Sequence, residues 1–359
     1  MQQRKVMVIA EAGVNHNGCR DQAFELIDAA AQAGADAVKF QTFRASRLVS
    51  RRAPKASYQK NATVPSESQL DMLRKLELPL DWHTDLQRYA RDRDIEFLST
   101  AFDADSLDFL CRMDLPLYKV PSGEINNSPL LWQFARCGRP LVLSTGMATL
   151  GEVEQALAVV SHALSREVEP SSMEEVWRAW SLPDVRLALA GKVTLLHCTS
   201  RYPTPPDEAN LAAMNTLTRA FGLPVGYSDH TAGIAIPIAA VALGAVIIEK
   251  HFTLDRTMKG PDHAASLEPE EMKAMIEQIR IVSGALGDAM KAPQVSEWDT
   301  RQAARQQIVA ARAIAKGAVL ARTDLTTARC GAGMPAAMLW DQVGRVAARS
   351  YEEGEVFQG

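Results

Sequence analysis

Eight short apolar segments recur along the chain up to residue 252, and each ends in polar residues. Their length and nearly continuous apolar character are typical of buried parallel strands. Helical patterns separate them, as in 19–34 and 151–164. This repetition predicts an α/β fold, the (β/α)₈ or TIM barrel, with its functional residues at the carboxyl ends of the strands. The segments are residues 6–13, 37–43, 95–102, 117–123, 140–147, 192–200, 224–230 and 245–252.

The length of the chain leaves room for more than a barrel. A barrel takes about 250 residues, and the chain has 359. We expect a catalytic barrel over 1–286, with a helical excursion at 165–191, a linker over 287–304, and a small β-rich domain over 305–359. A unit of roughly sixty residues is small for independent stability, so we expect it to dock on another surface.

Composition excludes several classes of protein. The net charge of −4 gives no basic footprint for nucleic acid. No apolar run approaches the roughly 20 residues of a membrane span, and the first strand begins without a signal-peptide pattern. The five cysteines are scattered and form no CxxC pair. A reduced, cytoplasmic protein is therefore expected.

Two histidines, His230 and His251, end the seventh and eighth predicted strands. Neighbouring strand ends can bring two imidazoles onto one metal ion. Two imidazoles without a thiolate suit a weakly held divalent ion such as Mn²⁺, with water or substrate completing the shell. The alternative for each is a histidine hydrogen-bonded in the core.

Cationic and hydroxyl side chains at other strand ends predict an anion site. Lysines supply charge, hydroxyls supply donors, and the helix after 144–152 presents its N-terminus to a phosphate. Either lysine could instead form a buried ion pair with Glu124 or Glu249. The side chains concerned are Lys39, Lys119, Ser122, Ser144, Thr145 and Ser228. Past the last strand, Asp262 either faces the same mouth or simply belongs to a Gly-Pro-Asp turn.

Ordered motifs along nearly the whole chain resemble the N-acetylneuraminate (sialic acid) synthase family, including its N,N'-diacetyllegionaminate synthase branch. The C-terminal ARCGAGMP resembles the signature of the antifreeze-like (SAF) domain of that family. The other motifs are IAEAGVNHNG, KFQTF, FLSTAFD, YKVPSGEINN, LSTGMATLGE, LLHCTSRYPTP, GYSDHT, EKHFTLD and GPDHAASLEP.

The resemblance implies a transferase that condenses phosphoenolpyruvate (PEP) with an open-chain N-acetylmannosamine-type sugar and releases phosphate by C–O cleavage. It implies Mn²⁺ or Mg²⁺ on His230 and His251, with Glu11 and Glu124 as catalytic carboxylates. It also implies a domain-swapped homodimer in which Arg329 reaches the partner's sugar. The implied PEP site is Lys39, Thr100, Lys119, Ser122, Ser144 and Ser228, and the implied sugar site adds Asn61, Tyr202 and Asp262.

Four positions depart from the pattern of the family. Ala101 and Cys330 each stand where proline is usual, Arg201 stands where an acidic residue is usual, and Lys259 stands where proline or serine is usual. Arg201 and Lys259 add positive charge on the expected sugar side. They are either solvated loop residues or signs of a more acidic acceptor.

Two other functions compete with this interpretation. A Schiff-base aldolase would use a strand-end lysine, Lys39, Lys119 or Lys250. A non-catalytic binding protein would act through its C-terminal domain, but that domain lacks flat threonine-rich repeats.

Overall fold

The computed structural model describes residues 5–50, 53–55 and 67–358. It divides the chain into two compact units, Met1–Asp288 and Ala289–Gly359. Each unit has its own buried apolar core.

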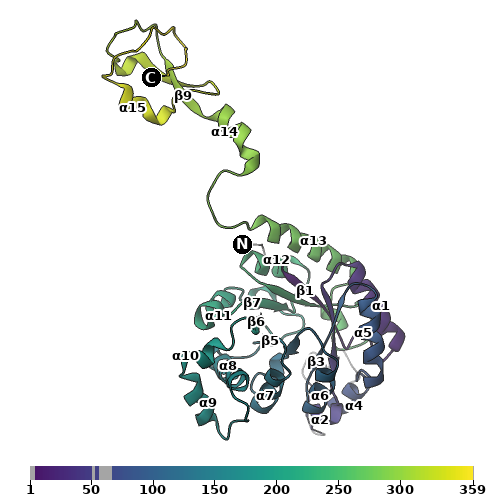
Figure 1. Ribbon diagram of the computed structural model, residues 1–359. Helices are drawn as coiled ribbons and strands as arrows, with labels where there is room; N and C mark the ends of the chain where they lie inside the picture. Colours follow the sequence, from purple (N-terminus) through teal and green to yellow (C-terminus); the bar gives the residue numbers. More distant parts are fainter. Residues whose placement is uncertain (1–4, 51–52, 56–66, 359) are drawn as a thin grey trace. The chain divides into compact units, whose positions relative to one another are not determined.

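The first unit is a ring of eight parallel strands surrounded by helices (Figure 1). The strands follow the order β3-β2-β1-β8-β7-β6-β5-β4, and β3 also contacts β4, which brings the two edges together. This arrangement confirms the predicted (β/α)₈ fold. The strands are β1 Met7–Gly13, β2 Ala37–Thr42, β3 Glu96–Ala101, β4 Tyr118–Val120, β5 Leu141–Ser144, β6 Val193–Cys198, β7 Val225–Asp229 and β8 Ile247–His251.

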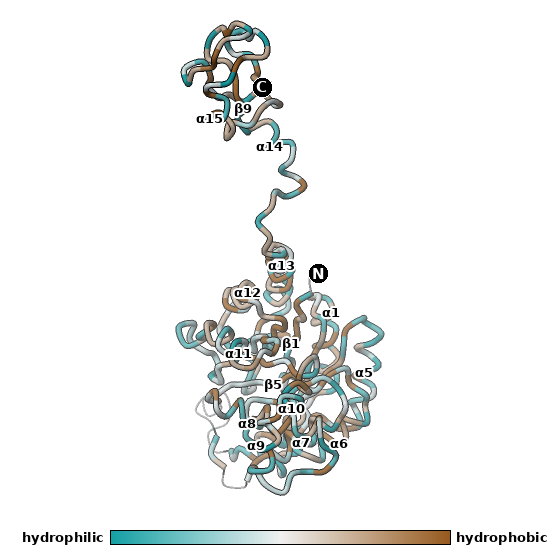
Figure 2. The backbone as a smooth tube through the Cα atoms, turned by 60° about the vertical axis from the view of Figure 1, so that its left-hand side comes forward, coloured by the Kyte–Doolittle hydropathy of each residue, from teal (hydrophilic) through white to brown (hydrophobic). Residues whose placement is uncertain are grey.

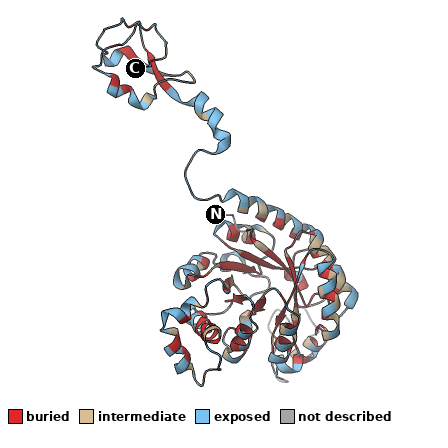
Figure 3. Ribbon diagram, in the orientation of Figure 1, coloured by how far each residue is buried: buried red, intermediate tan, exposed pale blue. Residues whose placement is uncertain are grey.

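Helices cover the outside of the ring, and their inner faces are buried while their outer faces are exposed (Figure 3). Several begin with local caps: Thr149 and Glu152 form a capping box at α8, and Pro269 occupies the first turn of α13. The predicted excursion holds α9 and α10. The helices are α1 Arg20–Gln32, α2 Ala45–Leu48, α4 Gln69–Arg74, α5 His83–Arg91, α6 Ala104–Arg112, α7 Ser128–Arg136, α8 Leu150–Ser165, α9 Met173–Trp180, α10 Pro183–Leu187, α11 Ala213–Phe221, α12 Ala235–Ala242 and α13 Pro269–Ala285.

The hydrophobic residues gather along the strands, while the surrounding loops are largely hydrophilic (Figure 2). Inside the barrel, buried apolar side chains from several strands form a separate cluster, called here the apolar layer. Gly226 stands at the same level of β7, where an added Cβ would lie 2.5 Å from Ile247 O and 2.7 Å from Leu196 Cδ2. The apolar layer consists of Ile9, Ala37, Leu98, Val142, Leu196 and Ile247.

Strands β4 and β5 are both much shorter than the sequence predicts, and the cause is visible for β4. The apolar segment 117–123 gives only a three-residue β4, followed at once by the 3-10 helix η2, Ser122–Glu124. Pro121 lies between them and has no N–H with which to continue the ladder. The following residues turn over the mouth of the barrel instead of extending the strand.

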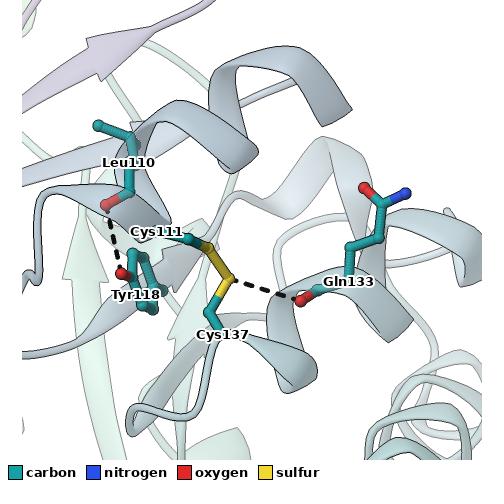
Figure 4. The surroundings of a disulfide bond; sticks show 5 residues. All are labelled: Leu110, Cys111, Tyr118, Gln133 and Cys137. Carbon is teal, nitrogen blue, oxygen red and sulfur yellow. Dashed lines mark hydrogen bonds between the residues drawn. A yellow bond between two sulfur atoms is a disulfide. The ribbon is translucent and has the colours of Figure 1, made fainter.

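A disulfide joins Cys111, near the end of α6, to Cys137, the residue after α7 (Figure 4). The two cysteines are 26 residues apart in sequence, with Cα atoms 5.7 Å apart. The expectation that all five cysteines are reduced is therefore wrong for this pair. Spacing alone missed it, because the contact depends on how two neighbouring helices align.

The second unit is small and β-rich, as predicted for the C-terminal residues. Its antiparallel strands β9, Gln306–Ala310, and β10, Leu325–Arg329, pair with Thr327 opposite Ile308. Helix α14, Trp298–Ala304, precedes them within the predicted linker, and α15, Leu339–Gln342, follows. Within the described residues of either unit, no helix is both long and apolar enough to cross a membrane.

Candidate active site

A polar layer of side chains lies above the apolar layer of the barrel. Side chains of a strand alternate between its two faces, so the residue two positions beyond an inward apolar residue also points inward. Ile9 is followed in this way by Glu11, Ala37 by Lys39, and Ile247 by Glu249. The polar layer comprises Glu11, Lys39, Thr100, Lys119, Ser144, Cys198, Ser228 and Glu249.

Four of these side chains form a buried ion network. Lys39 Nζ lies 2.5 Å from Glu11 Oε2 and 3.5 Å from Glu249 Oε2. Lys119 Nζ lies 3.2 Å from Glu249 Oε1. Glu249 is thus ion-paired with both lysines, which is the alternative to an anion site that the sequence left open. A carboxylate here marks where two cations converge.

Burial and the ion pairs shift the pKa of three members of the network. Although burial opposes ionisation, Lys119 and Lys39 hold the pKa of Glu249 well below its ordinary value. Burial also lowers the pKa of Lys39, but Glu11 and Glu249 outweigh it and raise the pKa overall. Burial, the largest influence, raises the pKa of Glu11 against the effect of Lys39.

Hydroxyl groups surround the two lysines. Thr100 Oγ1 accepts from Lys39 at 3.1 Å, and Ser228 Oγ donates to Glu249 at 2.9 Å. Ser144 is fully buried, and its hydroxyl has no hydrogen-bond partner among the described residues. Thr145 differs from its prediction, because its hydroxyl donates to Leu196 O at 2.9 Å and is used within the fold.

Gly146 lets the loop after β5 approach its neighbours closely. Its N–H donates to Ser122 Oγ at 3.1 Å, and an added Cβ would lie 2.6 Å from that oxygen and 2.4 Å from Ser200 Oγ. Only glycine fits at this position without displacing Ser122. The Gly146 backbone thereby orients one of the hydroxyls assigned to the anion site.

His230 and His251 meet at the level above the polar layer. Their ring centroids are 5.3 Å apart, and Tyr202 packs against both, at 4.1 Å from His230 and 5.5 Å from His251. His230 Nδ1 lies 2.7 Å from Thr199 O, which accepts a hydrogen bond from it, so Nε2 is the ring nitrogen that could bind a metal. Burial lowers the pKa of His230, but Cys198 and the Thr199 carbonyl outweigh burial and raise the pKa overall. Tyr202, assigned to the sugar by resemblance, therefore also borders the histidine pair.

The histidine pair suits a divalent ion. His251 Nδ1 is buried, finds no hydrogen-bond partner in the described part of the chain, and lies 3.9 Å from Asp262 Oδ2. Burial, followed by His230 and Lys39, lowers the pKa of His251 well below its ordinary value, so the ring is neutral and can donate its lone pair. The described residues contain no cluster of three or more metal-binding side chains. An ion here would need ligands from water or substrate.

The remaining predicted residues differ in their placement. Burial and the neighbouring Glu11 raise the pKa of Asp262 to about 7, and its Oδ2 lies 3.9 Å from His251 Nδ1. Glu124 is half-buried and accepts from Asn127 Nδ2 at 2.7 Å, within its own loop. Arg329 ends β10 in the second unit and is exposed. Asn61 lies outside the described residues.

Lys250, one of the three lysines that a Schiff-base aldolase could use, does not face this site. Lys250 is fully buried and paired with Asp229 at 2.5 Å, on the opposite face of β8 from Glu249 and His251. Lys39 and Lys119 are both held by carboxylates. A charged, ion-paired lysine is a poor nucleophile.

The four departures from the family pattern also have structural positions. Arg201 is exposed and pairs with Glu208 at 3.1 Å, and Lys259 is exposed. Ala101 is buried at the end of β3. Cys330 donates its backbone N–H to Gln307 Oε1 at 3.3 Å. Arg201 is therefore a solvated loop residue whose charge is already balanced.

Three further side chains belong to the site, although the sequence assigned no catalytic or binding role to them. Glu249 is the centre of the ion network, Gln41 donates to Glu11 at 2.9 Å, and Cys198 Sγ lies 3.7 Å from His230 Nδ1. The signal for Glu249 was present, because it stands two residues before His251 and shares its face. Cys198 stands two residues after the inward-facing Leu196, so the same alternation places it on the inner face of the barrel.

Comparisons with known proteins match this architecture. The NeuB family matches residues 26–291, and the SAF domain matches residues 305–359. The N,N'-diacetyllegionaminic acid synthase of Campylobacter jejuni is 45% identical over 356 residues, 99% of each chain. The enzyme of the same name from Legionella pneumophila is 44% identical and covers 94% of this chain and 89% of its own.

A solved structure agrees with these relatives. The N-acetylneuraminic acid (sialic acid) synthetase of Leptospira borgpetersenii is 32% identical, with a TM-score of 0.68, and covers 83% of this chain and 90% of its own. The match spans both sequence and fold, as the ordered motifs predicted. The chain belongs to the NeuB family and carries a C-terminal SAF domain.

Proposed function

We propose that this protein is a nonulosonic (sialic-type) acid synthase, a transferase that condenses PEP with an open-chain N-acylated mannosamine-type sugar. One observation carries the proposal. Two buried lysines share the polar layer with Ser144, whose hydroxyl has no hydrogen-bond partner among the described residues, and a pair of imidazoles lies at the next level of the barrel. The family of the chain supports the same reaction.

In this proposal PEP occupies the polar layer. Its phosphate and carboxylate take over the two lysines from Glu249, and the hydroxyls of Ser144 and Ser122 donate to the same oxygens. Charge-assisted bonds of this kind are shorter and stronger than neutral ones. In the absence of PEP, the carboxylate of Glu249 takes the place beside the two lysines that an anionic group of PEP would occupy.

A divalent ion, Mn²⁺ or Mg²⁺, is part of the proposal, and His230 and His251 would hold it. When bound, it supplies a Lewis acid for the sugar aldehyde. Tyr202 packs on both rings and limits their movement. Asp262 lies beside His251 and faces the same mouth, where it can contact a sugar hydroxyl.

The reaction balances with water as the third reactant. The C2–C3 electron pair of PEP forms the new bond to the aldehyde carbon, whose oxygen takes up a proton. Water adds its oxygen to C2 and loses one proton, which gives a C2 hydroxyl group. The C2–O bond to phosphate then breaks with its electron pair, while the C2 hydroxyl loses its proton and becomes the keto group. Positive charge develops at C2 during attack, and a nearby carboxylate stabilises it. Glu11 lies in the polar layer and fits this role better than Glu124, which bonds Asn127 within its own loop.

The acceptor follows from the relatives. Identity of 45% and 44% to two N,N'-diacetyllegionaminic acid synthases supports 2,4-diacetamido-2,4,6-trideoxymannose. N-acetylmannosamine, giving N-acetylneuraminate, is the second candidate, supported by the 32% identity to the Leptospira synthetase.

The proposal includes a homodimer in which Arg329 of one subunit completes the sugar site of the other. Its support is the small size of the second unit and the exposure of Arg329 in it. A cytoplasmic location is also proposed. Cys19, Cys198 and Cys330 lie outside any disulfide and support it, whereas the Cys111–Cys137 bond is more typical of an oxidising compartment.

The test is phosphate release from PEP with each acceptor in turn, with Mn²⁺, Mg²⁺ or EDTA. We expect metal-dependent release that is faster with the diacetamido sugar. Release without a sugar, or none with any mannosamine-type sugar, would overturn the proposal. Borohydride trapping of PEP or product on a lysine would favour the Schiff-base alternative.

A further inference from the structure

A buried ion pair lies behind the two histidines, on the outer face of the strands that carry them. Lys250 Nζ is 2.5 Å from Asp229 Oδ2, and both side chains are completely buried. Asp229 directly precedes His230, and Lys250 directly precedes His251. Each residue of the pair is therefore joined to one of the two histidines by a single peptide bond.

The register of β7 against β8 places the Ser228–Glu249 pair and the Asp229–Lys250 pair at successive positions of the ladder. In the β7–β8 ladder, Ser228 is opposite Glu249 and Asp229 is opposite Lys250, which is the last pair of the ladder. Ser228 bonds Glu249 on the inner face, and Asp229 bonds Lys250 on the outer face. The next step brings His230 and His251 to the inner face beyond the end of the ladder. There, no backbone pairing of β7 with β8 is recorded among the described residues.

Both charges of the pair also hold the backbone after His230. Lys250 Nζ donates to Thr231 O, while Asp229 accepts from the Thr231 N–H at 2.9 Å and from its hydroxyl at 3.1 Å. The His230 carbonyl in turn accepts from Thr204 N at 2.8 Å. The turn that carries the His230 ring is thus fixed from both sides.

Stability alone does not account for such a pair. Removing two charges from water is costly, and replacing a buried ion pair by apolar residues of similar size is often neutral or stabilising. A fully satisfied pair does restrict geometry, because each charge must keep its partner.

We propose that Asp229 and Lys250 are positioning residues that set the spacing and orientation of His230 and His251, and so the affinity of the site for a divalent ion. The inference rests on the proposed function, because it takes these histidines as the ligands. Neither Asp229 nor Lys250 touches the substrates in this account. Their loss should weaken metal binding more than PEP binding.

The test uses the full-length double variant Asp229→Asn/Lys250→Met, which removes both charges and leaves no isolated buried one. The matched control is Arg280→Met, which breaks the 2.6 Å pair with Asp36 at the opposite end of the strands. Mn²⁺ affinity is measured by electron paramagnetic resonance of the free ion, without substrates. PEP affinity is measured by calorimetry in EDTA, and Tm by thermal unfolding.

We expect the double variant to bind Mn²⁺ roughly tenfold more weakly, as for other residues that orient metal ligands. Its PEP affinity should stay within about threefold of the wild type, and the control should keep wild-type affinity for both. Unchanged Mn²⁺ affinity in the folded double variant would overturn the inference alone. Equal losses of Mn²⁺ and PEP would overturn it too, as general damage to the mouth. A wild-type protein that binds no Mn²⁺ would instead overturn the metal site of the proposed function, and the inference with it.

Discussion

Lys119 occupies the side of the polar layer away from Glu11. Its ammonium group contacts Glu249 and lies on β4, whereas Lys39 lies on β2 with both glutamates nearby. In the proposed PEP complex, Lys119 would exchange the Glu249 carboxylate for an oxygen of the ligand. Substitution of Lys119 therefore leaves Glu249 paired with Lys39, whereas substitution of Lys39 leaves Glu11 without its lysine.

We predict that Lys119→Ala weakens PEP binding ten- to hundredfold, because it removes one charge-assisted bond worth about 1.5–3 kcal/mol. Lys39 still compensates Glu249 in this variant, so folding should be retained. The KM for PEP from initial rates checks this. Lys192→Ala, at an exposed position before β6, is the control. An unchanged KM in Lys119→Ala would contradict the assigned role.

A second prediction at the scale of single residues concerns the pH dependence of folding stability, and it rests on His83. It is fully buried, lies 2.7 Å from Thr42 Oγ1 through Nε2, and burial lowers its pKa to about 4. The folded protein keeps His83 neutral below pH 6.5, where the unfolded chain takes up a proton. Stability is therefore lost as the pH falls from about 6.5 to about 4, by about 2 kcal/mol at pH 5 for this group.

The variant His83→Gln should lose less stability between pH 7 and pH 5 than the wild type does, although its stability at pH 7 is lower. Urea unfolding of the barrel at the two pH values measures the difference. Equal losses in the two proteins would show that His83 does not carry the effect.

At the scale of elements, the positions of the strands could be predicted from the sequence, whereas the side-chain contacts between strands could not. The eight apolar segments and their polar ends follow from chain periodicity, so the barrel and both histidines could be placed. The pairing of Glu249 with two lysines depends on the register of β8 beside β1 and β7, which no local pattern contains. The early end of β4 at Pro121 was visible in the sequence and was overlooked.

Helices α6 and α7 are tied by the Cys111–Cys137 disulfide. Closing a loop of this length is expected to stabilise the folded chain by about 3 kcal/mol, chiefly through the unfolded state. We predict that dithiothreitol lowers the free energy of unfolding of the wild type by this amount. Cys111→Ala/Cys137→Ala should be insensitive to dithiothreitol. A wild type that does not respond would show that the two thiols are not joined in solution.

At the scale of the whole molecule, the proposed swapped dimer makes a complementation prediction. Arg329→Ala and His230→Ala should each be inactive alone. After subunit exchange, each mixed dimer carries one site with both the histidine pair and the arginine, so activity should return. Exchange is verified with differently tagged subunits. A mixture that exchanges and stays inactive would place Arg329 in its own subunit's site or outside catalysis.

The central claim is the reaction itself, and the fate of the bridging oxygen of PEP tests it most directly. PEP labelled with ¹⁸O at that position is incubated with the diacetamido sugar and Mn²⁺, using the wild type, His230→Ala and His251→Ala. We predict that the released phosphate keeps the label, because the C–O bond breaks, and that both histidine variants release none. Phosphate without the label, or full turnover by either histidine variant, would contradict the account.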